Sequence, residues 1–171
     1  LDRREETKWD VCIRSTLPQY VFSNAVKLME EPLYLAFHKD SWLRNMEKVR
    51  LSDIRNEQFV MLRSGGSIRT ISEAIFEKEG IIPDIAFECD DIHVLRRMVQ
   101  EGVGITIWPK YSWRDHLRSE TDFANVCYRP IDNNEFKRSL YLILQKDLKI
   151  TEELEKFCKY TEKYFNSIKE E

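Results

Sequence analysis

The chain has 171 residues; 42% are hydrophobic, 33% are charged, and 27 Lys and Arg residues stand against 30 Asp and Glu residues. This composition is typical of a globular domain and excludes a disordered segment. A chain of this length can bury roughly 70% of the surface that its unfolded form exposes, so a substantial core is expected. The net charge of -3 argues against a duplex-binding surface, which needs a basic face.

Export and membrane signals are missing from the sequence. No apolar run approaches the ~20 residues of a membrane span, and the charged opening LDRREETKWD lacks the layout of a secretory signal. Because the sequence does not begin with Met, we expect it to be a fragment of a longer protein. The cysteines Cys12, Cys89, Cys127 and Cys158 form no CxxC or metal-spaced cluster, which indicates reduced thiols in a cytosolic protein without a metal or cofactor.

Apolar runs and the residues that interrupt them predict the elements in chain order. Strands are expected over residues 9–13, 28–37, 59–62, 85–87, 103–107, 126–131 and 139–144. Helices are expected over residues 68–79, 92–101 and 152–168, and the third has the clearest apolar face. Gly80 and Gly102 end the first two helices, Asp90 or Asp91 caps the second, and Thr151 caps the third. Strands and helices alternate over residues 59–107, which favours a mainly parallel sheet and an α/β fold.

Polar turns that follow three of the predicted strands form a candidate ligand site. In open α/β sheets, ligands bind beyond the carboxyl ends of the strands, where helix N-termini present free N–H groups. The candidate residues are Arg14, Ser15 and Thr16 after the first strand, Ser64, Gly65, Gly66 and Ser67 after the third, and Cys89, Asp90 and Asp91 after the fourth. The SGGS turn is the most informative of the three, because its glycines let the backbone approach a ligand closely.

The helix that begins at the SGGS turn points its positive end toward this site, and Arg14, Arg63 and Arg69 add positive charge. This chemistry favours a small anion, such as a carboxylate. The alternative is that SGGS is only a loop followed by a helix cap, because Gly and Ser are common in any turn between a strand and a helix. The residues alone leave both interpretations open.

Enzyme signatures are missing from the sequence. It has no P-loop, GxGxxG, GxSxG or HExxH motif, and its three histidines are far apart. Isolated histidines of this kind are more typical of a surface or a strand end than of a catalytic site. Glu88, Asp90 and Asp91 are the only acids or bases near the candidate turns, and we therefore expect no enzymatic activity.

The order of several segments resembles the effector-binding domain of LysR-type transcriptional regulators. The matching stretches are PLYLAFHKDSWL, VRLSDIRNEQFVML and IRTISEAIFEKEGIIPDIAFECDDIHVLRRMVQEGVGITIWP, and WDVCI resembles a further strand of that family. The strongest piece is AFECDDIHVLRRMVQEGVGITIWP, in which a strand, an acidic turn, an apolar helix ending in VxxGxGI and a strand ending in Pro follow one another. The resemblance covers about residues 9–168.

This resemblance implies a periplasmic-binding-protein-like fold of type II, in which two crossing strands join two α/β subdomains. Residues 1–38 and 132–171 would form the first subdomain, without its N-terminal βα unit, and residues 39–131 would form the second. The three candidate turns would then line one cleft between the subdomains.

The resemblance also implies a ligand-sensing regulatory domain. A small anionic effector would bind between the subdomains, and the change would reach DNA-binding heads through the geometry of a homodimer or homotetramer. DNA would be bound only through a winged helix-turn-helix that this chain lacks, in the cytoplasm and without a membrane. Two alternatives share the fold, a solute-binding protein of a transporter and a dehydratase-like enzyme.

Overall fold

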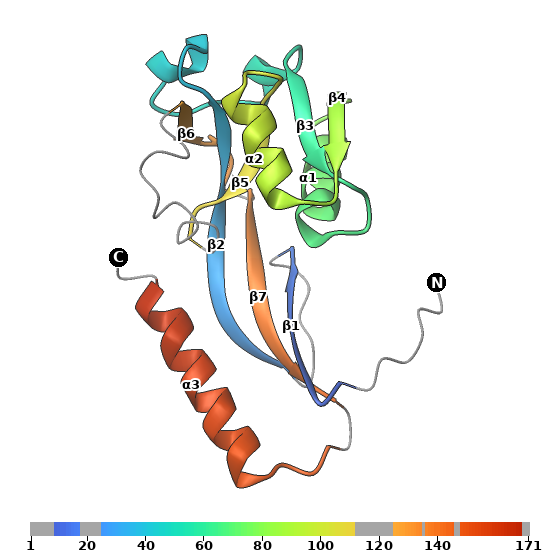
Figure 1. Cartoon of the computed structure of the whole chain (residues 1–171), viewed down its shortest axis with the longest axis vertical. Helices are drawn as coiled ribbons and strands as arrows, with labels where there is room; N and C mark the ends of the chain where they lie inside the picture. Colours follow the sequence, from blue (N-terminus) through green and yellow to red (C-terminus); the bar gives the residue numbers. More distant parts are fainter. Residues whose placement is uncertain (1–8, 18–24, 112–124, 135, 146–147, 169–171) are drawn as a thin grey trace. The chain divides into compact units, whose positions relative to one another are not determined.

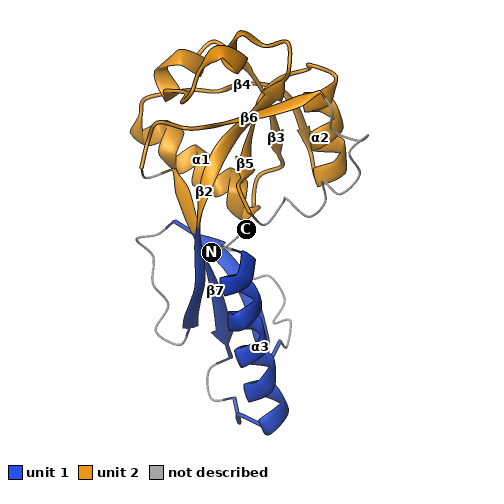
Figure 2. Cartoon of the chain, turned by 90° about the vertical axis from the view of Figure 1, so that its left-hand side faces the viewer, with its two compact units in different colours: residues 1–30, 139–171 blue, residues 31–138 orange. Residues whose placement is uncertain are grey.

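The computed structural model describes residues 9–17, 25–111, 125–134, 136–145 and 148–168. The chain forms two compact units, residues 1–30 with 139–171 (unit 1) and residues 31–138 (unit 2), which are coloured in Figure 2. The strands β2 (Ala25–His38) and β7 (Lys137–Leu144) contribute residues to both units, so the chain passes between the units along these two strands.

Unit 2 contains the predicted alternation of strands and helices (Figure 1). The elements are β3 (Gln58–Leu62), α1 (Ser67–Lys78), β4 (Asp84–Cys89), α2 (Ile92–Gln100) and β5 (Thr106–Pro109). β3 pairs with β4 in parallel, and Phe59 of β3 forms a parallel bridge with Ile105, which confirms the predicted parallel arrangement over this stretch. β2 pairs antiparallel with both β5 and β6 (Val126–Pro130), so the strands of the domain as a whole are mixed.

The two helices of unit 2 pack on opposite faces of β3. The ring of Phe59 meets the ring of Phe76 on α1 edge-on, with 5.3 Å between the centroids. The next residue, Val60, packs with Leu95 and Val99 of α2. Successive side chains of a strand point to opposite faces, and β3 is therefore buried between α1 and α2.

Glycines end both helices and allow the chain to return to the sheet. Gly80 follows α1 with φ +66° and Gly102 follows α2 with φ +74°, conformations that favour glycine. Gly104 is required for a different reason, because a Cβ atom there would lie 2.5 Å from the carbonyl oxygen of Gln58. This close approach lets the N–H of Ile105 donate to that carbonyl at 2.8 Å.

Unit 1 contains β1 (Val11–Thr16), part of β2, most of β7, and α3 (Glu152–Ile168). β1 pairs antiparallel with β7 from Val11 opposite Leu144 to Thr16 opposite Ser139. The predicted end of this strand at residue 13 was wrong, because the ladder with β7 extends it to Thr16 over residues whose polar side chains resemble those of a turn.

The cap of α3 is confirmed, since the Thr151 hydroxyl accepts a hydrogen bond from the N–H of Leu154 at 3.3 Å. The apolar face of α3 is partly covered. Thr161 is buried and Leu154, Cys158, Phe165 and Ile168 are half-buried, whereas Phe157 and Tyr164 are 47% and 45% exposed.

Two short 3-10 helices lie in unit 2, at Trp42–Asn45 and at Leu51–Ile54. The structure places the start of β2 at Ala25, ahead of the predicted residue 28. Among the helices in the described ranges, none is both long and apolar enough to cross a membrane.

Candidate ligand site

The turns after β3 and β4 lie next to each other at one edge of the parallel strand pair. The N–H of Arg63 donates to the carbonyl of Cys89 at 2.8 Å, and the Arg63 guanidinium pairs with the carboxylate of Asp90 at 2.9 Å. Parallel pairing explains this proximity, because the carboxyl ends of both strands point the same way. The structure thus brings together the candidates at 64–67 and 89–91.

The third set of candidates has a different local setting. Arg14, Ser15 and Thr16 belong to unit 1 and lie within β1, where they pair with residues 139–141 of β7. The prediction that these three residues form a turn after a strand is therefore wrong. The prediction that they contact a ligand stays a prediction.

The N-terminus of α1 has no side-chain cap. Gly65 has φ +97°, a conformation that favours glycine, and Gly66 is the N-cap residue with an extended backbone and no capping hydrogen bond. A Cβ atom at Gly66 would meet only the carbonyl oxygen of Arg63, at 3.9 Å, so the fold leaves room for a larger residue there. The first N–H groups of a helix lack partners within the helix, and at α1 these groups can receive an anion.

The N-terminus of α2 is capped. The carboxylate of Asp91 accepts hydrogen bonds from the N–H of His93 at 2.6 Å and of Val94 at 3.2 Å. These bonds, above all the one from Val94, lower the pKa of Asp91 below its ordinary value. Of the two residues predicted to cap this helix, Asp91 is the one that does so, and its carboxylate is engaged by the protein itself.

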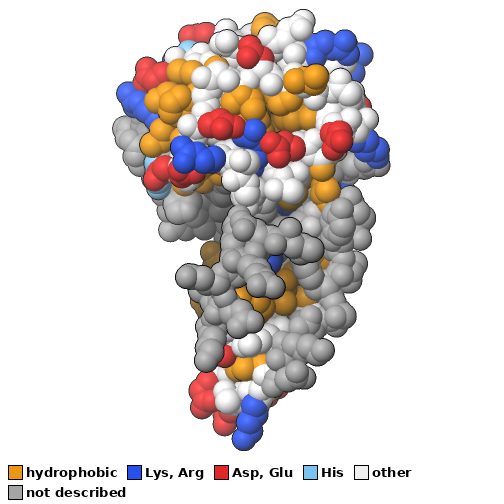
Figure 3. Space-filling view, turned by 90° about the vertical axis from the view of Figure 1, so that its right-hand side faces the viewer, with side chains coloured by type: hydrophobic (Ala, Val, Ile, Leu, Met, Phe, Trp, Pro, Cys, Tyr) orange, Lys and Arg blue, Asp and Glu red, His pale blue; other side chains and the backbone are white. Residues whose placement is uncertain are grey.

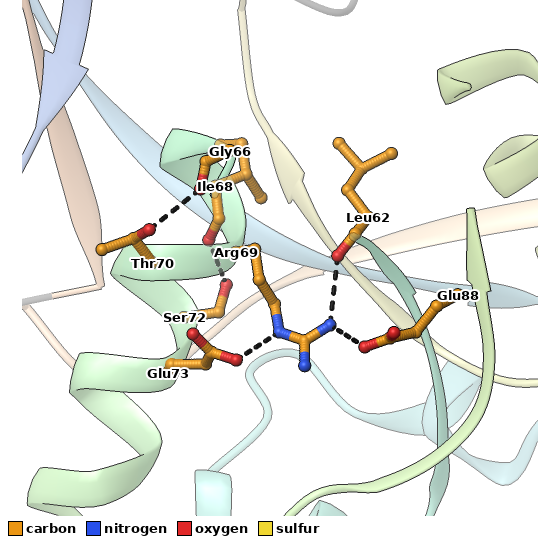
Figure 4. Close-up of polar contacts among 8 residues, drawn as sticks. All are labelled: Leu62, Gly66, Ile68, Arg69, Thr70, Ser72, Glu73 and Glu88. Carbon is orange, nitrogen blue, oxygen red and sulfur yellow. Dashed lines mark hydrogen bonds and ion pairs between the residues drawn. The ribbon is translucent and has the colours of Figure 1, made fainter. Parts of the chain in front are cut away.

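Arg69 is a buried link between α1 and the ends of both parallel strands (Figure 4). The residue is 8% exposed, and its guanidinium donates to Glu73 at 2.5 Å, to Glu88 of β4 and to the carbonyl of Leu62 at 3.1 Å. Burial lowers the pKa of Arg69, but the hydrogen bonds to Glu88 and Glu73 outweigh it and leave the pKa raised. Arg69 therefore anchors the helix and does not supply free positive charge.

The position of Glu73, four residues after Arg69, could have indicated part of this network, because side chains at that spacing are neighbours on a helix. Glu88 gave no such signal. It follows Arg69 by 19 residues, and the contact exists only because β4 lies beside β3.

Arg63 is held less tightly than Arg69. Its ion pair with Asp90 joins side chains that are 62% and 67% exposed. Exposed pairs of this kind contribute about 0–1 kcal/mol, so Arg63 can exchange its partner with little loss. On the face shown in Figure 3, acidic and basic side chains are interspersed with hydrophobic ones.

Cys89 closes the turn between β4 and α2. Its side chain is buried, and its thiol donates to the carbonyl of Asp91 at 3.3 Å. Burial raises the pKa of this thiol, which keeps it protonated near neutral pH. All four cysteines are free, and within the described part of the chain no three His, Cys, Asp or Glu side chains are grouped as metal ligands.

Residues 1–166 match the sequence model of the LysR substrate binding domain. The chain is 30% identical over 143 residues to the hydrogen peroxide-inducible genes activator of Pectobacterium carotovorum subsp. carotovorum, a match that covers 84% of this chain and 46% of the relative. The chain thus spans about half the length of the curated relatives it matches.

Solved structures of similar fold include two ligand complexes. The effector binding domain of QuiR in complex with shikimate matches with a TM-score of 0.74 and 19% identity, over 93% of this chain and 73% of that chain. The Synechocystis CcmR regulatory domain in complex with 2-PG matches with a TM-score of 0.76 and 18% identity, over 91% and 73% of the two chains. These structural matches confirm the predicted fold class. Because the family match covers almost the whole chain, the chain belongs to the LysR substrate binding domain family.

Proposed function

We propose that this chain is the ligand-sensing domain of a LysR-type transcriptional regulator and that a small anionic effector binds at the uncapped start of α1. The observation that carries the proposal is the contrast between the two helix N-termini of unit 2. Asp91 caps α2, whereas Gly66 leaves the first N–H groups of α1 without a capping side chain. A helix end of this kind favours negative charge.

The neighbouring side chains indicate what sort of anion fits. Ser64 and Ser67 add hydroxyl groups, and Arg63 can leave Asp90 to pair with the ligand. Once released, the carboxylate of Asp90 accepts hydrogen bonds and repels further negative charge. We therefore propose an effector with one anionic group and hydroxyl donors, such as a hydroxycarboxylate, in preference to a polyanion.

In this proposal the effector lies between the subdomains of residues 1–38 with 132–171 and residues 39–131. Arg14, Ser15 and Thr16 contribute from the first subdomain, and residues 64–67 and 89–91 from the second. Binding favours one arrangement of the subdomains over another, which requires different effector affinity in the two arrangements. A homodimer or homotetramer of the whole cytoplasmic protein passes this shift to DNA-binding heads outside this chain.

Two other functions fit the side chains less well. A catalytic acid or base needs a pKa near the working pH, whereas the pKa of Asp91 is lowered by its capping bonds and Glu88 is held by Arg69. Peroxide sensing, suggested by the names of two relatives, needs a thiol of lowered pKa; burial raises the pKa of Cys89 and Cys158, so neither of these two thiols suits that role.

The proposal is tested by the substitution Gly66→Asp. An aspartate at this N-cap position supplies the missing capping carboxylate and places a negative charge where the anion binds. We expect the free protein to gain roughly a few tenths of a kcal/mol of stability, because Asp is only slightly better than Gly as an N-cap residue. Effector affinity should fall at least about tenfold, since like charges repel at short range.

Binding is measured by thermal shift and then by calorimetry, with a panel of small hydroxycarboxylates, sugar phosphates and their neutral esters. A ligand at a hundredfold excess over its Kd stabilises the folded state by about 2.7 kcal/mol. The matched control is Thr151→Asp, which adds the same charge at the N-cap of α3 in unit 1 and should leave affinity unchanged. If an effector binds Gly66→Asp as tightly as the wild type, the start of α1 is not part of the binding site.

A further inference from the structure

Ser139, the first residue of β7 that belongs to unit 1, carries a buried hydroxyl group. Its side chain is 0% exposed, and its hydroxyl forms no hydrogen bond within the described part of the chain. A hydroxyl group can both donate and accept, and protein interiors rarely leave such a group without a partner. Burial without a partner is unfavourable for the fold, so a serine at this position requires a physical explanation.

A second hydroxyl residue lies directly opposite Ser139 on the neighbouring strand. In the antiparallel ladder of β1 and β7, which lie side by side in Figure 1, Thr16 is the partner of Ser139. Opposite residues of such a ladder point to the same face of the sheet, with Cβ atoms about 4.5–5.5 Å apart. The two side chains therefore form a hydroxyl pair on one face of the unit 1 sheet, the Thr16–Ser139 pair.

The Thr16–Ser139 pair lies at the margin of the sheet. β1 is the first strand in the order β1-β7-β2-β5, and its ladder with β7 ends at this pair. Thr16 is half-buried and Arg14, two residues earlier on the same face, is exposed. A buried hydroxyl without a hydrogen-bond partner thus lies next to side chains that solvent reaches.

The alternation of side chains along β1 also divides its three candidate ligand residues. Arg14 and Thr16 share the face of Ser139, whereas Ser15 is opposite Leu140 and points to the other face. A ligand on the Ser139 face can contact the side chains of Arg14 and Thr16. It can contact Ser15 only through the backbone.

A hydroxyl group of a ligand suits the Thr16–Ser139 pair better than a charged or an apolar group. It can donate to one hydroxyl of the pair and accept from the other, which supplies the missing partner of Ser139. A carboxylate placed against Ser139 would lose its hydration among neutral groups, which is costly. An apolar group would leave the Ser139 hydroxyl without a partner.

We propose that Thr16 and Ser139 bind a hydroxyl group of the effector and that Ser139 selects hydroxylated effectors over their deoxy analogues. This inference rests on the proposed function, because it assigns a site in unit 1 to the hydroxyl of the proposed hydroxycarboxylate. Sites that hydrogen-bond a ligand hydroxyl discriminate against the analogue that lacks it, since the buried partner then stays unsatisfied. Ser139 is accordingly a specificity-determining residue that lies outside the candidate turns.

The test compares Ser139→Ala with the wild type in the full chain, by calorimetry with matched probes. Each pair of probes differs by one hydroxyl: glycolate with acetate, lactate with propionate, and mandelate with phenylacetate. Ser139→Ala should bind the hydroxylated probe about tenfold more weakly than the wild type does, and the deoxy probe equally well. Thr16→Val, which removes the other hydroxyl and keeps the shape of the side chain, should weaken the same probes.

Stability without any probe gives a second readout. Ser139→Ala removes the buried hydroxyl that lacks a partner, so its Tm should be roughly 2–4 °C higher than that of the wild type. Ser167→Ala is the matched control in unit 1, because the hydroxyl of Ser167 on α3 already donates to the carbonyl of Tyr164 at 2.8 Å. This control should bind every probe as the wild type does.

The inference is overturned if Ser139→Ala binds the hydroxylated probes as tightly as the wild type, or loses both members of a pair equally. If Gly66→Asp weakens binding of the same probes, the proposed function stands although this inference has failed. A lower Tm of Ser139→Ala without probes also overturns it, because the hydroxyl would then serve the fold itself. If the wild type binds no member of any pair, the result counts against the proposed hydroxycarboxylate and this inference together.

Discussion

Replacing Arg69 by Met removes the guanidinium that joins α1 to the ends of β3 and β4 and keeps a side chain of similar length. The hydrogen bond from the charged guanidinium to the carbonyl of Leu62 contributes about 1 kcal/mol. The bonds to Glu73 and Glu88, whose side chains are 47% and 38% exposed, contribute about 0.5 kcal/mol each after screening by solvent. The expected loss of unfolding free energy is therefore about 2 kcal/mol, which lowers the Tm by roughly 4–8 °C for a chain of this size.

Urea denaturation followed by circular dichroism measures this loss, with Arg63→Met as the matched control. Arg63 forms an exposed pair with Asp90, so its replacement should change stability by about 0.5 kcal/mol or less. Adding Glu88→Gln to Arg69→Met should cost little more, because the partner is already lost. If both arginine variants lose the same stability, the distinction drawn here between an anchoring Arg69 and an exchangeable Arg63 is refuted.

Three further predictions concern unit 2. Gly104→Ala should destabilise the chain by about 2 kcal/mol, because its Cβ would press on the backbone of Gln58, whereas Gly66→Ala, which has space, should cost far less in the same denaturation assay. Because the pKa of Asp91 is lowered in the folded chain, its contribution to stability is present above the ordinary aspartate pKa and is lost as the pH falls through the folded pKa. The unfolding free energies of wild type and Asp91→Asn, measured against pH, should therefore converge below the folded pKa. Parallel curves would contradict the assignment of Asp91 as the cap. Because burial raises the pKa of Cys89, its alkylation by iodoacetamide at pH 7 should be much slower in the folded than in the unfolded chain, and equal rates would show that the thiol is neither buried nor protonated.

The elements of unit 2 could be predicted because their signals are local. Gly80 and Gly102 end the helices with the backbone conformations that glycine allows, and Asp91 caps α2 through residues two and three positions away. The alternation of strands and helices in this stretch was then sufficient to predict the parallel pairing of β3 with β4. The adjacency of the turns at 64–67 and 89–91 follows from that pairing.

The features that the sequence did not reveal depend on contacts between distant residues. β1 continues to Thr16 because β7, more than 100 residues later, supplies a partner for each position. Glu31 reads as a surface residue beside Glu30, and only the fold brings Arg138 to it. Arg69 was expected to add positive charge to the site. That expectation missed its partner Glu88, because Glu88 lies on β4, far from Arg69 in the sequence.

At the start of α1, the backbone is held in place and the N-cap residue supplies no capping side chain. These two properties have separate causes. Arg69 holds the first turn against β3 and β4, and Gly65 sets the approach of the chain, so little ordering is left for a ligand to impose. Gly66 meanwhile forgoes the small stabilisation that a capping Ser or Asp would give, although a Cβ atom there would meet only the carbonyl oxygen of Arg63, at 3.9 Å. A helix start without a capping side chain, beside an anchor that fixes its geometry, suits a binding site better than a structural turn. The Gly66→Asp variant separates the two interpretations, because a structural turn would gain stability and lose nothing, whereas a binding site would gain stability and lose its effector.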